Sequence, residues 1–195
     1  MKISRLIFFL IGLIVLGFIG FKAFYKFNFN YSVGQRIDSL NGVFVYYNGS
    51  VSNVSGRNKA SDGYNLGMKY QCVEFVKRYY YEYLKHKMPN SFGNAIDFFD
   101  RDIGDGQYNK NRDLIQYTNP GKAKPKPDDL LIYSATKSNK YGHVAIVSKG
   151  SENEIEIIQQ NPGRFAKSRE TYKLENNGGE WIIKNKRILG WLRKE

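Results

Sequence analysis

The chain has 195 residues, of which 42% are hydrophobic and 15% are aromatic. This length suits one compact domain, and this composition excludes a chain that is disordered throughout. Thirty Lys and Arg residues outnumber eighteen Asp and Glu residues, which gives a net charge of +12. The basic residues are scattered among acidic ones without a stripe of arginines, so we expect no nucleic acid as partner. Attraction to an acidic cell wall or lipid surface explains the charge, and a compositional bias towards Lys and Asn without functional meaning is the alternative.

The amino terminus contains a long apolar segment. Leu6 to Phe21 is an uncharged run of sixteen residues, and Lys2 and Arg5 precede it. As a helix the run spans about 24 Å, and Ala23 to Tyr25 extend it towards the about 30 Å of a hydrocarbon core. The pattern predicts a membrane anchor within residues 1–26: one transmembrane helix in a bacterial cytoplasmic membrane, with the following domain outside the cell. A cleaved signal peptide, and hence a secreted protein, is the alternative, although a small-x-small cleavage site is lacking.

The remainder of the chain divides into a short connection and one domain. Residues 27–41 are interpreted as a tether, and residues 42–195 as a single catalytic domain without internal repeats. Gly42 to Tyr47 predicts a strand, which the turn signal Asn48-Gly49 closes. We expect the protein to be a monomer.

A helix is predicted next, over residues 71–86, because apolar residues recur there every three or four positions. Glu74 lies four residues before Arg78, a spacing that favours an exposed ion pair on this helix. Ala95 to Phe99 predicts a second, shorter helix.

The second half of the chain is rich in strand-forming residues. Four such segments are separated by clusters of Pro, Gly, Asn and Lys, at Leu130–Tyr133, Val144–Ser148, Ile155–Gln160 and Arg187–Arg193. Helices followed by antiparallel strands predict an α+β domain.

Cys72 is the one cysteine of the chain, so no intramolecular disulfide forms. A lone cysteine is often a small buried hydrophobic residue. This one falls in the first turn of the predicted helix, where free backbone N–H groups and the helix dipole stabilise a thiolate. The same N–H groups also suit the oxyanion of a tetrahedral intermediate. The position therefore favours a catalytic nucleophile.

Of the two histidines, His86 lies at the far end of the same helix and cannot reach Cys72. His143 opens a predicted strand directly after a Tyr-Gly turn, and a residue at the start of a strand lies at the rim of a sheet. A histidine there is often only a polar residue at a sheet edge, but within reach of a helix packed across the sheet it would serve as the base for Cys72.

A third residue follows from strand alternation. His143 points to one face of its strand, and Gln159 and Asn161 share one face of the next strand. If the hairpin turn lies within Ser148 to Asn153, residues opposite each other have numbers that sum to 302 or 304. The first sum pairs His143 with Gln159, and the second pairs it with Asn161. Either amide would orient the imidazole, as in thiol acyl transfer.

Five segments carry a family resemblance: GMKYQCVEFVKRYY, PDDLLIY, YGHVAIV, IIQQN and ILGWLR. Together they resemble the CHAP domain, the cysteine- and histidine-dependent amidohydrolases/peptidases. NGVFVYYNG, the Asp62-Gly63 pair and YQCVEF are most similar to the amidase domain of glutathionylspermidine synthetase/amidase. The resemblance implies a papain-like fold in which helices pack on an antiparallel sheet, with Cys72 as nucleophile and His143 as base. The family usually has Glu-x-Asn after the histidine strand, whereas this chain has Gln159 in place of the Glu, with Asn161 retained.

The resemblance predicts a thiol-dependent hydrolase of peptide or amide bonds. Peptidoglycan stem peptides are the first expected substrate, and a glutathionylspermidine-type conjugate is the alternative. A catalytically weak module that binds cell wall is a third interpretation, which the replacement at Gln159 suggests. We expect no cofactor. We also expect no metal, because the acidic loop around Asp100 and Asp105 lacks the spacing of an EF-hand.

Overall fold

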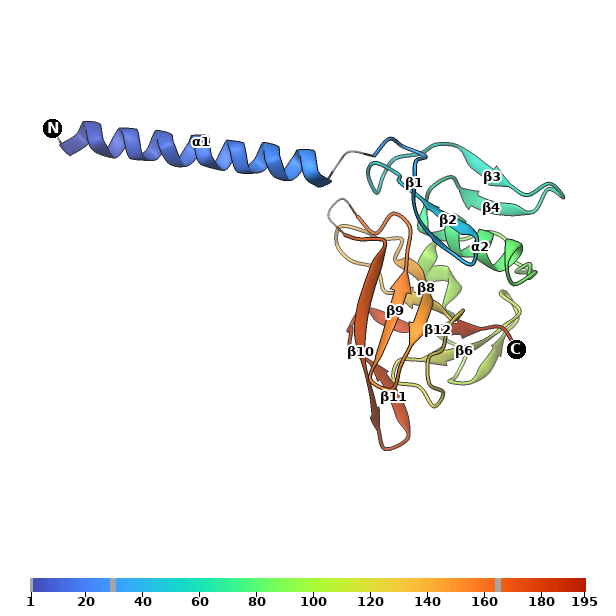
Figure 1. The fold of residues 1–195 in the computed structure, drawn as a ribbon. Coiled ribbons are helices and arrows are strands. Elements are labelled where there is room, and N and C mark those ends of the chain that lie inside the picture. The colour runs from blue at the N-terminus through green and yellow to red at the C-terminus, as the bar shows by residue number, and fades with distance from the viewer. Residues whose placement is uncertain (1, 29–30, 164–165) are drawn as a thin grey trace. The chain divides into compact units, whose positions relative to one another are not determined.

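A computed structural model describes residues 2–28, 31–163 and 166–195, with the backbone alone for residues 2–6 and 23–28. The chain forms two compact units, Met1–Ser32 and Val33–Glu195. The first contains helix α1 (Lys2–Asn28), and the second contains all strands and the remaining helices (Figure 1).

The apolar segment at the amino terminus is helical, but the predicted transmembrane helix is wrong. Among the described residues, no helix is long and apolar enough to span a membrane. The physical reason is the length of the apolar segment, since the sixteen uncharged residues Leu6 to Phe21 cover only about 24 Å of a core of about 30 Å. The prediction of a single-pass protein in the cytoplasmic membrane is corrected with it. The side chains of Lys2, Arg5 and Ala23–Tyr25 lie outside the described residues.

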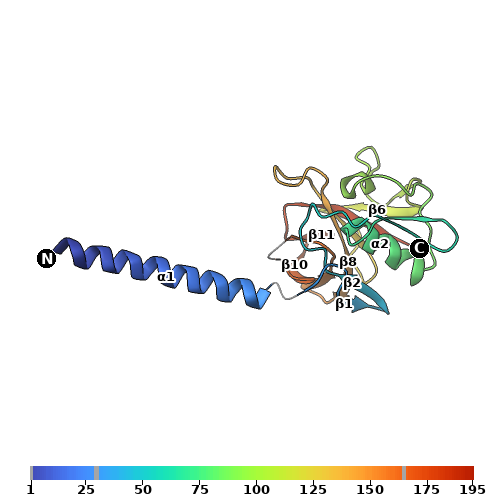
Figure 2. The same cartoon turned by 90° about the horizontal axis from the view of Figure 1, so that it is seen from above.

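Eight antiparallel strands form the principal sheet, in the order β11-β10-β9-β8-β7-β12-β6-β5 (Figures 1 and 2). In chain order these strands are β5 (Gln107–Asn109), β6 (Leu114–Thr118), β7 (Leu130–Tyr133), β8 (His143–Gly150), β9 (Glu154–Ile158), β10 (Arg169–Asn177), β11 (Glu180–Ile183) and β12 (Ile188–Arg193). Two hairpins accompany the sheet: β1 (Arg36–Leu40) with β2 (Val43–Tyr46), and β3 (Arg57–Lys59) with β4 (Asn65–Met68). A CHAP, papain-like fold fits this architecture, which is mostly sheet.

Helix α2 (Cys72–Glu82) packs against the sheet because its apolar residues form one buried face. Phe75, Val76 and Tyr79 are fully buried beside Val144 and Ile146 of β8. Strand alternation separates a second core on the other side, built around Trp191 and residues of β7 to β11. Central strands with both faces buried explain the nearly continuous apolar runs of β7 and β8.

Both predicted helices of the domain are shorter than expected. The first ends at Glu82 rather than His86, with Tyr83 as its C-cap. The second is a single 3-10 turn, Ala95–Phe98, in which the side chains of Asn94 and Asp97 form a capping box. Asn and Asp favour such local side-chain bonds over a longer helix.

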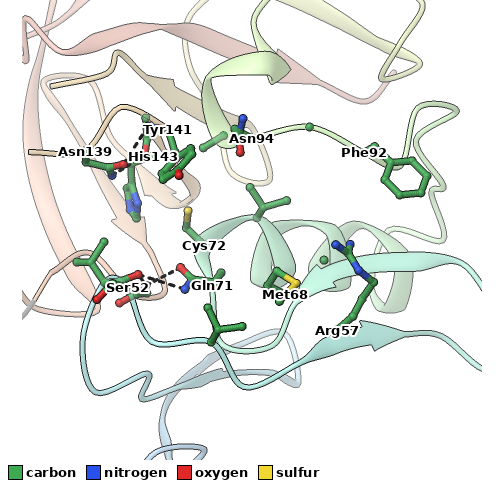
Figure 3. A pocket seen from close by; sticks show the side chains of 18 of the residues that line it. Ser52, Arg57, Met68, Gln71, Cys72, Phe92, Asn94, Asn139, Tyr141 and His143 are labelled. Carbon is green, nitrogen blue, oxygen red and sulfur yellow. Dashed lines mark hydrogen bonds between the residues drawn. The ribbon is translucent and has the colours of Figure 1, made fainter. Parts of the chain in front are cut away.

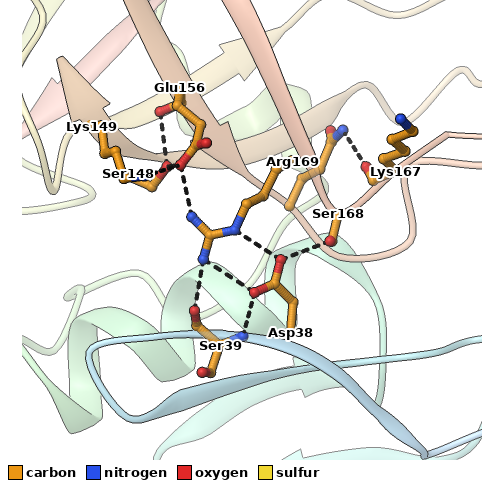
Figure 4. A network of polar contacts seen from close by, with 9 residues as sticks. Asp38, Ser39, Ser148, Lys149, Glu156, Lys167, Ser168 and Arg169 are labelled. Atoms are coloured by element: carbon orange, nitrogen blue, oxygen red, sulfur yellow. Dashed lines mark hydrogen bonds and ion pairs between the residues drawn. The ribbon is translucent and has the colours of Figure 1, made fainter. Parts of the chain in front are cut away.

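Residues 27–41, interpreted as a tether, include the paired strand β1, while residues 29–30 lie outside the described residues. An ion network holds β1 to the sheet, since Arg169 of β10 contacts Asp38 at 2.9 Å and Glu156 of β9 at 2.8 Å (Figure 4). Ser168 donates a further hydrogen bond to Asp38 at 2.7 Å. The part of the range that contains Asp38 therefore belongs to the folded domain.

Candidate active site

Cys72 is the first residue of α2, and Gln71 is its N-cap. The thiol lies where the first-turn N–H groups have no partner within the helix, as the sequence predicts. Cys72 is half-buried. Burial raises the pKa of its thiol to about 11, and hydrogen bonds from the backbone of Val144, Val73 and Cys72 itself oppose that shift only partly. The resting residue is therefore a thiol, and the expectation that the helix terminus holds a thiolate is not met.

His143 is the first residue of β8 and is almost fully buried. Gly142 precedes it with a φ of 73°, and a Cβ at Gly142 would lie 2.7 Å from the carbonyl oxygen of Tyr133. Only glycine fits this approach. Asn139 donates to the Gly142 carbonyl at 2.8 Å, which fixes the turn that delivers the imidazole.

Gln159 contacts the imidazole directly, with its Oε1 2.9 Å from His143 Nε2. The Gln159 amide nitrogen donates to the Lys167 carbonyl at 3.0 Å, so Oε1 is the atom that faces the histidine. Because that oxygen only accepts hydrogen bonds, Nε2 carries the proton and Nδ1 keeps the lone pair of a base. Burial lowers the pKa of His143 to about 4, although the Gln159 hydrogen bond acts in the opposite direction. The imidazole is therefore neutral at pH 7.

Asn161 lies in the same region but does not hold the imidazole in this structure. Its Nδ2 donates to Gln71 Oε1 at 2.7 Å and to the Val51 carbonyl at 3.2 Å. Pairs such as Ile146 with Ile158 follow the sum of 304, which would place Asn161 opposite His143. However, β9 ends at Ile158 and Asn161 has a φ of 54°, so the chain turns away and Gln159 makes the contact.

Gln160, which sequence reasoning left without a role, connects the histidine side of the site to the cysteine side. Its Nε2 donates to the Gln71 carbonyl at 3.0 Å and to Glu74 Oε2 at 2.8 Å. Glu74 also receives the predicted bond from Arg78, at 2.7 Å. That pair is buried, which corrects the prediction of an exposed one. The run of three amide side chains directly after β9, Gln159 to Asn161, was the sequence signal that could have pointed to Gln160.

Cys72, His143 and Asn161 line a pocket of about 610 Å³. Gln159 lies behind the histidine, outside the pocket wall. Figure 3 shows the thiol and the imidazole pointing into this pocket, the first from the start of α2 and the second from β8. Within the described part of the chain, no hydrogen bond joins the two side chains. Catalytic hydrogen bonds often tighten only in the substrate complex, so this arrangement is compatible with proton transfer.

The model of one protein family, the CHAP domain, matches residues 62–161. These residues make up just over half of the chain, and they contain Cys72, His143, Gln159 and Asn161. The chain belongs to the CHAP family. The resemblance seen in the sequence is therefore confirmed.

Two curated relatives are synthetases. The chain is 32% identical over 133 residues to trypanothione synthetase of Crithidia fasciculata, a match that covers 66% of this chain and 20% of that protein. It is 28% identical over 143 residues to glutathionylspermidine synthase of the same organism, covering 65% of this chain and 19% of that protein. The chain thus spans about a fifth of the length of these relatives.

Two solved structures are similar at lower identity. The structure of Ly7917 has a TM-score of 0.40 and 16% identity, and covers 75% of this chain and 58% of that chain. The structure of the endolysin LysIME-EF1 has a TM-score of 0.38 and 19% identity, and covers 73% of this chain and 60% of that chain.

Proposed function

We propose that this CHAP domain hydrolyses amide bonds, with Cys72 as nucleophile, His143 as base and Gln159 as the residue that orients the imidazole. The observation that carries the proposal is the 2.9 Å contact between His143 Nε2 and Gln159 Oε1, which leaves Nδ1 unprotonated in a pocket that also contains the thiol. A thiol, a base and an orienting amide are the components of thiol acyl transfer.

In the first half of the reaction, His143 Nδ1 takes the thiol proton as the sulfur of Cys72 attacks the carbonyl carbon of the substrate. The first-turn N–H groups of α2 stabilise the oxyanion. The C–N bond then breaks, and the imidazolium gives its proton to the departing amine. In the second half, His143 removes a proton from water, the hydroxide attacks the thioester, and the carboxylic acid leaves as the thiol is restored.

We favour a glutathione–polyamine conjugate as the substrate. The support is the similarity to the two Crithidia relatives, whose names refer to trypanothione and glutathionylspermidine.

Peptidoglycan stem peptides remain the second candidate, because a net charge of +12 attracts an acidic polymer. Side-by-side turnover assays on glutathionylspermidine and on purified sacculi test both substrates, with Cys72→Ala as the control. Release of spermidine by the wild-type protein alone supports the first substrate, and release of stem peptides supports the second. Hydrolysis of neither would contradict the proposed function.

A further inference from the structure

Among the described residues that line the pocket, Arg57 is the one Lys or Arg side chain. It lies on β3, is exposed, and donates from one guanidinium nitrogen to Asn65 Oδ1 at 2.9 Å. Several N–H groups of the guanidinium fork are thus available to a bound molecule. In Figure 3, Arg57 and Phe92 lie at one end of the pocket, and Cys72 and His143 lie at the other.

Lys77 lies directly behind this end of the pocket. It is a buried residue of α2, and its Nζ donates to the carbonyls of Asn65 and Ser91, two residues of the pocket wall. Burial, together with the positive charges of Arg112 and Arg57, lowers the pKa of Lys77 to about 8. Lys77 therefore remains a cation at pH 7, within the field of two others.

Arg112 is the third cation and is also buried. Its guanidinium donates to the carbonyls of Asn90 at 2.6 Å, of Phe92 at 3.3 Å and of Asp97 at 3.0 Å. These bonds hold the loop that supplies Phe92 and its neighbours to the pocket. The Asp97 carboxylate partly offsets the charge, but it accepts the Asn94 backbone N–H instead of forming an ion pair with Arg112.

Among the residues that the structure describes, neither Arg57, Lys77 nor Arg112 forms an ion pair with an acidic side chain. Buried charges are normally paired, and two of these three are buried. None of the described residues that line the pocket is acidic. This end of the pocket therefore has a positive potential that the described side chains leave largely unbalanced.

We infer that this end of the pocket binds a carboxylate of the substrate, with Arg57 as the contacting residue and Lys77 and Arg112 supplying the field behind it. The inference rests on the proposed function for the identity of the substrate, but the binding of the anion does not require turnover. Both candidate substrates carry suitable carboxylates, in the glutathione part of the conjugate or in the stem peptide. Arginine binds a carboxylate through two parallel hydrogen bonds, which also fixes its orientation relative to Cys72.

Binding to a protein that cannot turn over separates this inference from the proposed function. In a Cys72→Ala background, calorimetry would measure the affinity for glutathione and for acetyl-D-Ala-D-Ala, each beside a form with its carboxylates esterified. We expect at least one acid to bind more tightly than its ester. Arg57→Gln should weaken the acid about tenfold and leave the ester unchanged, and Arg57→Lys should restore part of the loss.

Lys59→Gln is the matched control, because Lys59 lies on the same strand, is exposed, and is not part of the pocket wall. It removes one positive charge and should change affinity little. Melting temperatures would establish that the variants are folded. The glutathione and dipeptide arms distinguish the source of the carboxylate. Equal binding of acid and ester, binding of neither acid, or equal losses in Arg57→Gln and Lys59→Gln would overturn the inference.

Discussion

The two ends of the pocket differ in the charge of their side chains. At one end burial keeps Cys72 a thiol and His143 a neutral base, since it raises the first pKa to about 11 and lowers the second to about 4. At the other end Arg57 is exposed, and Lys77 and Arg112 are positive without an ion pair among the described residues. The neutral Cys72 and His143 suit transfer of the thiol proton to the imidazole during the reaction. The fixed positive charge at the other end favours binding of an anion. The comparison suggests that chemistry and recognition are divided between the ends.

The largest expected effect is at the reactive end. Cys72→Ala should lower turnover by at least about a thousandfold, and His143→Ala should be similarly severe, because nucleophile and base act as a unit. Their combined loss should therefore be no greater than either single loss. Turnover assays on both candidate substrates, with thermal melting as the control for folding, check this. A Cys72→Ala variant that keeps its activity would contradict the assignment.

Acid should destabilise the protein through His143. Its folded pKa of about 4 lies below the ordinary value of 6.5, which holds in the unfolded chain. The unfolded state therefore binds a proton first, so the contribution of this residue is complete above pH 6.5 and is lost as the pH falls towards 4. The loss amounts to about 3 kcal/mol in the free energy of unfolding.

Urea denaturation at pH 7 and pH 4 measures this loss, and His143→Gln should remove that part of the pH dependence while the carboxylates keep theirs. An identical acid response in both proteins would show that the imidazole is not held neutral by burial.

Alkylation of Cys72 tests the other partner. With a folded pKa of about 11 against an ordinary value of 9.0, the thiolate fraction near pH 7 should be about a hundredfold lower than in the unfolded chain. Iodoacetamide should therefore react slowly with the native protein and rapidly in urea. Since Cys72 is the one cysteine, the mass of the intact protein reports it without ambiguity. Fast native labelling that slows in His143→Ala would instead indicate a thiolate–imidazolium pair.

A smaller effect is expected from the residue that orients the imidazole. Gln159→Leu removes one hydrogen bond to His143 and should lower turnover about tenfold. Gln159→Glu should raise the imidazole pKa and move the acidic limb of the pH–rate profile upward, because a carboxylate stabilises the charged ring. Asn161→Ala should cost less than Gln159→Leu, since Asn161 contacts Gln71 and not the histidine. The reverse order would make Asn161 the orienting residue.

Local patterns predicted much of this site. The position of Cys72 follows from the start of an amphipathic helix, and strand parity restricted the partner of His143 to Gln159 or Asn161. Parity could not decide between them, because the choice depends on where β9 ends and on the backbone of Asn161.

Strand β7 falls where its apolar run predicts it. Strand β3 could not be predicted, because its residues Arg57–Lys59 are all polar and show no alternation of apolar and polar residues. It forms a strand by pairing with β4.

Properties that arise from distant contacts were not predictable. The spacing of Glu74 and Arg78 predicted an exposed ion pair, but the pair is buried, and Gln160, 86 residues from Glu74, donates a hydrogen bond to its carboxylate. The helix terminus alone favours a thiolate at Cys72, and burial by the sheet reverses that preference. The apolar segment at the amino terminus predicts a helix correctly, but its uncharged run is shorter than a helix needs to cross the hydrocarbon core.

The most direct test of the central claim is detection of the covalent intermediate. Acid quenching during turnover, followed by mass spectrometry of the intact protein and its peptides, should show the acyl part of the substrate attached to the peptide that contains Cys72. Hydroxylamine should remove this adduct, as expected of a thioester, and Cys72→Ala should never form it. Turnover that proceeds at an undiminished rate in Cys72→Ala, without an adduct on any peptide, would contradict the account.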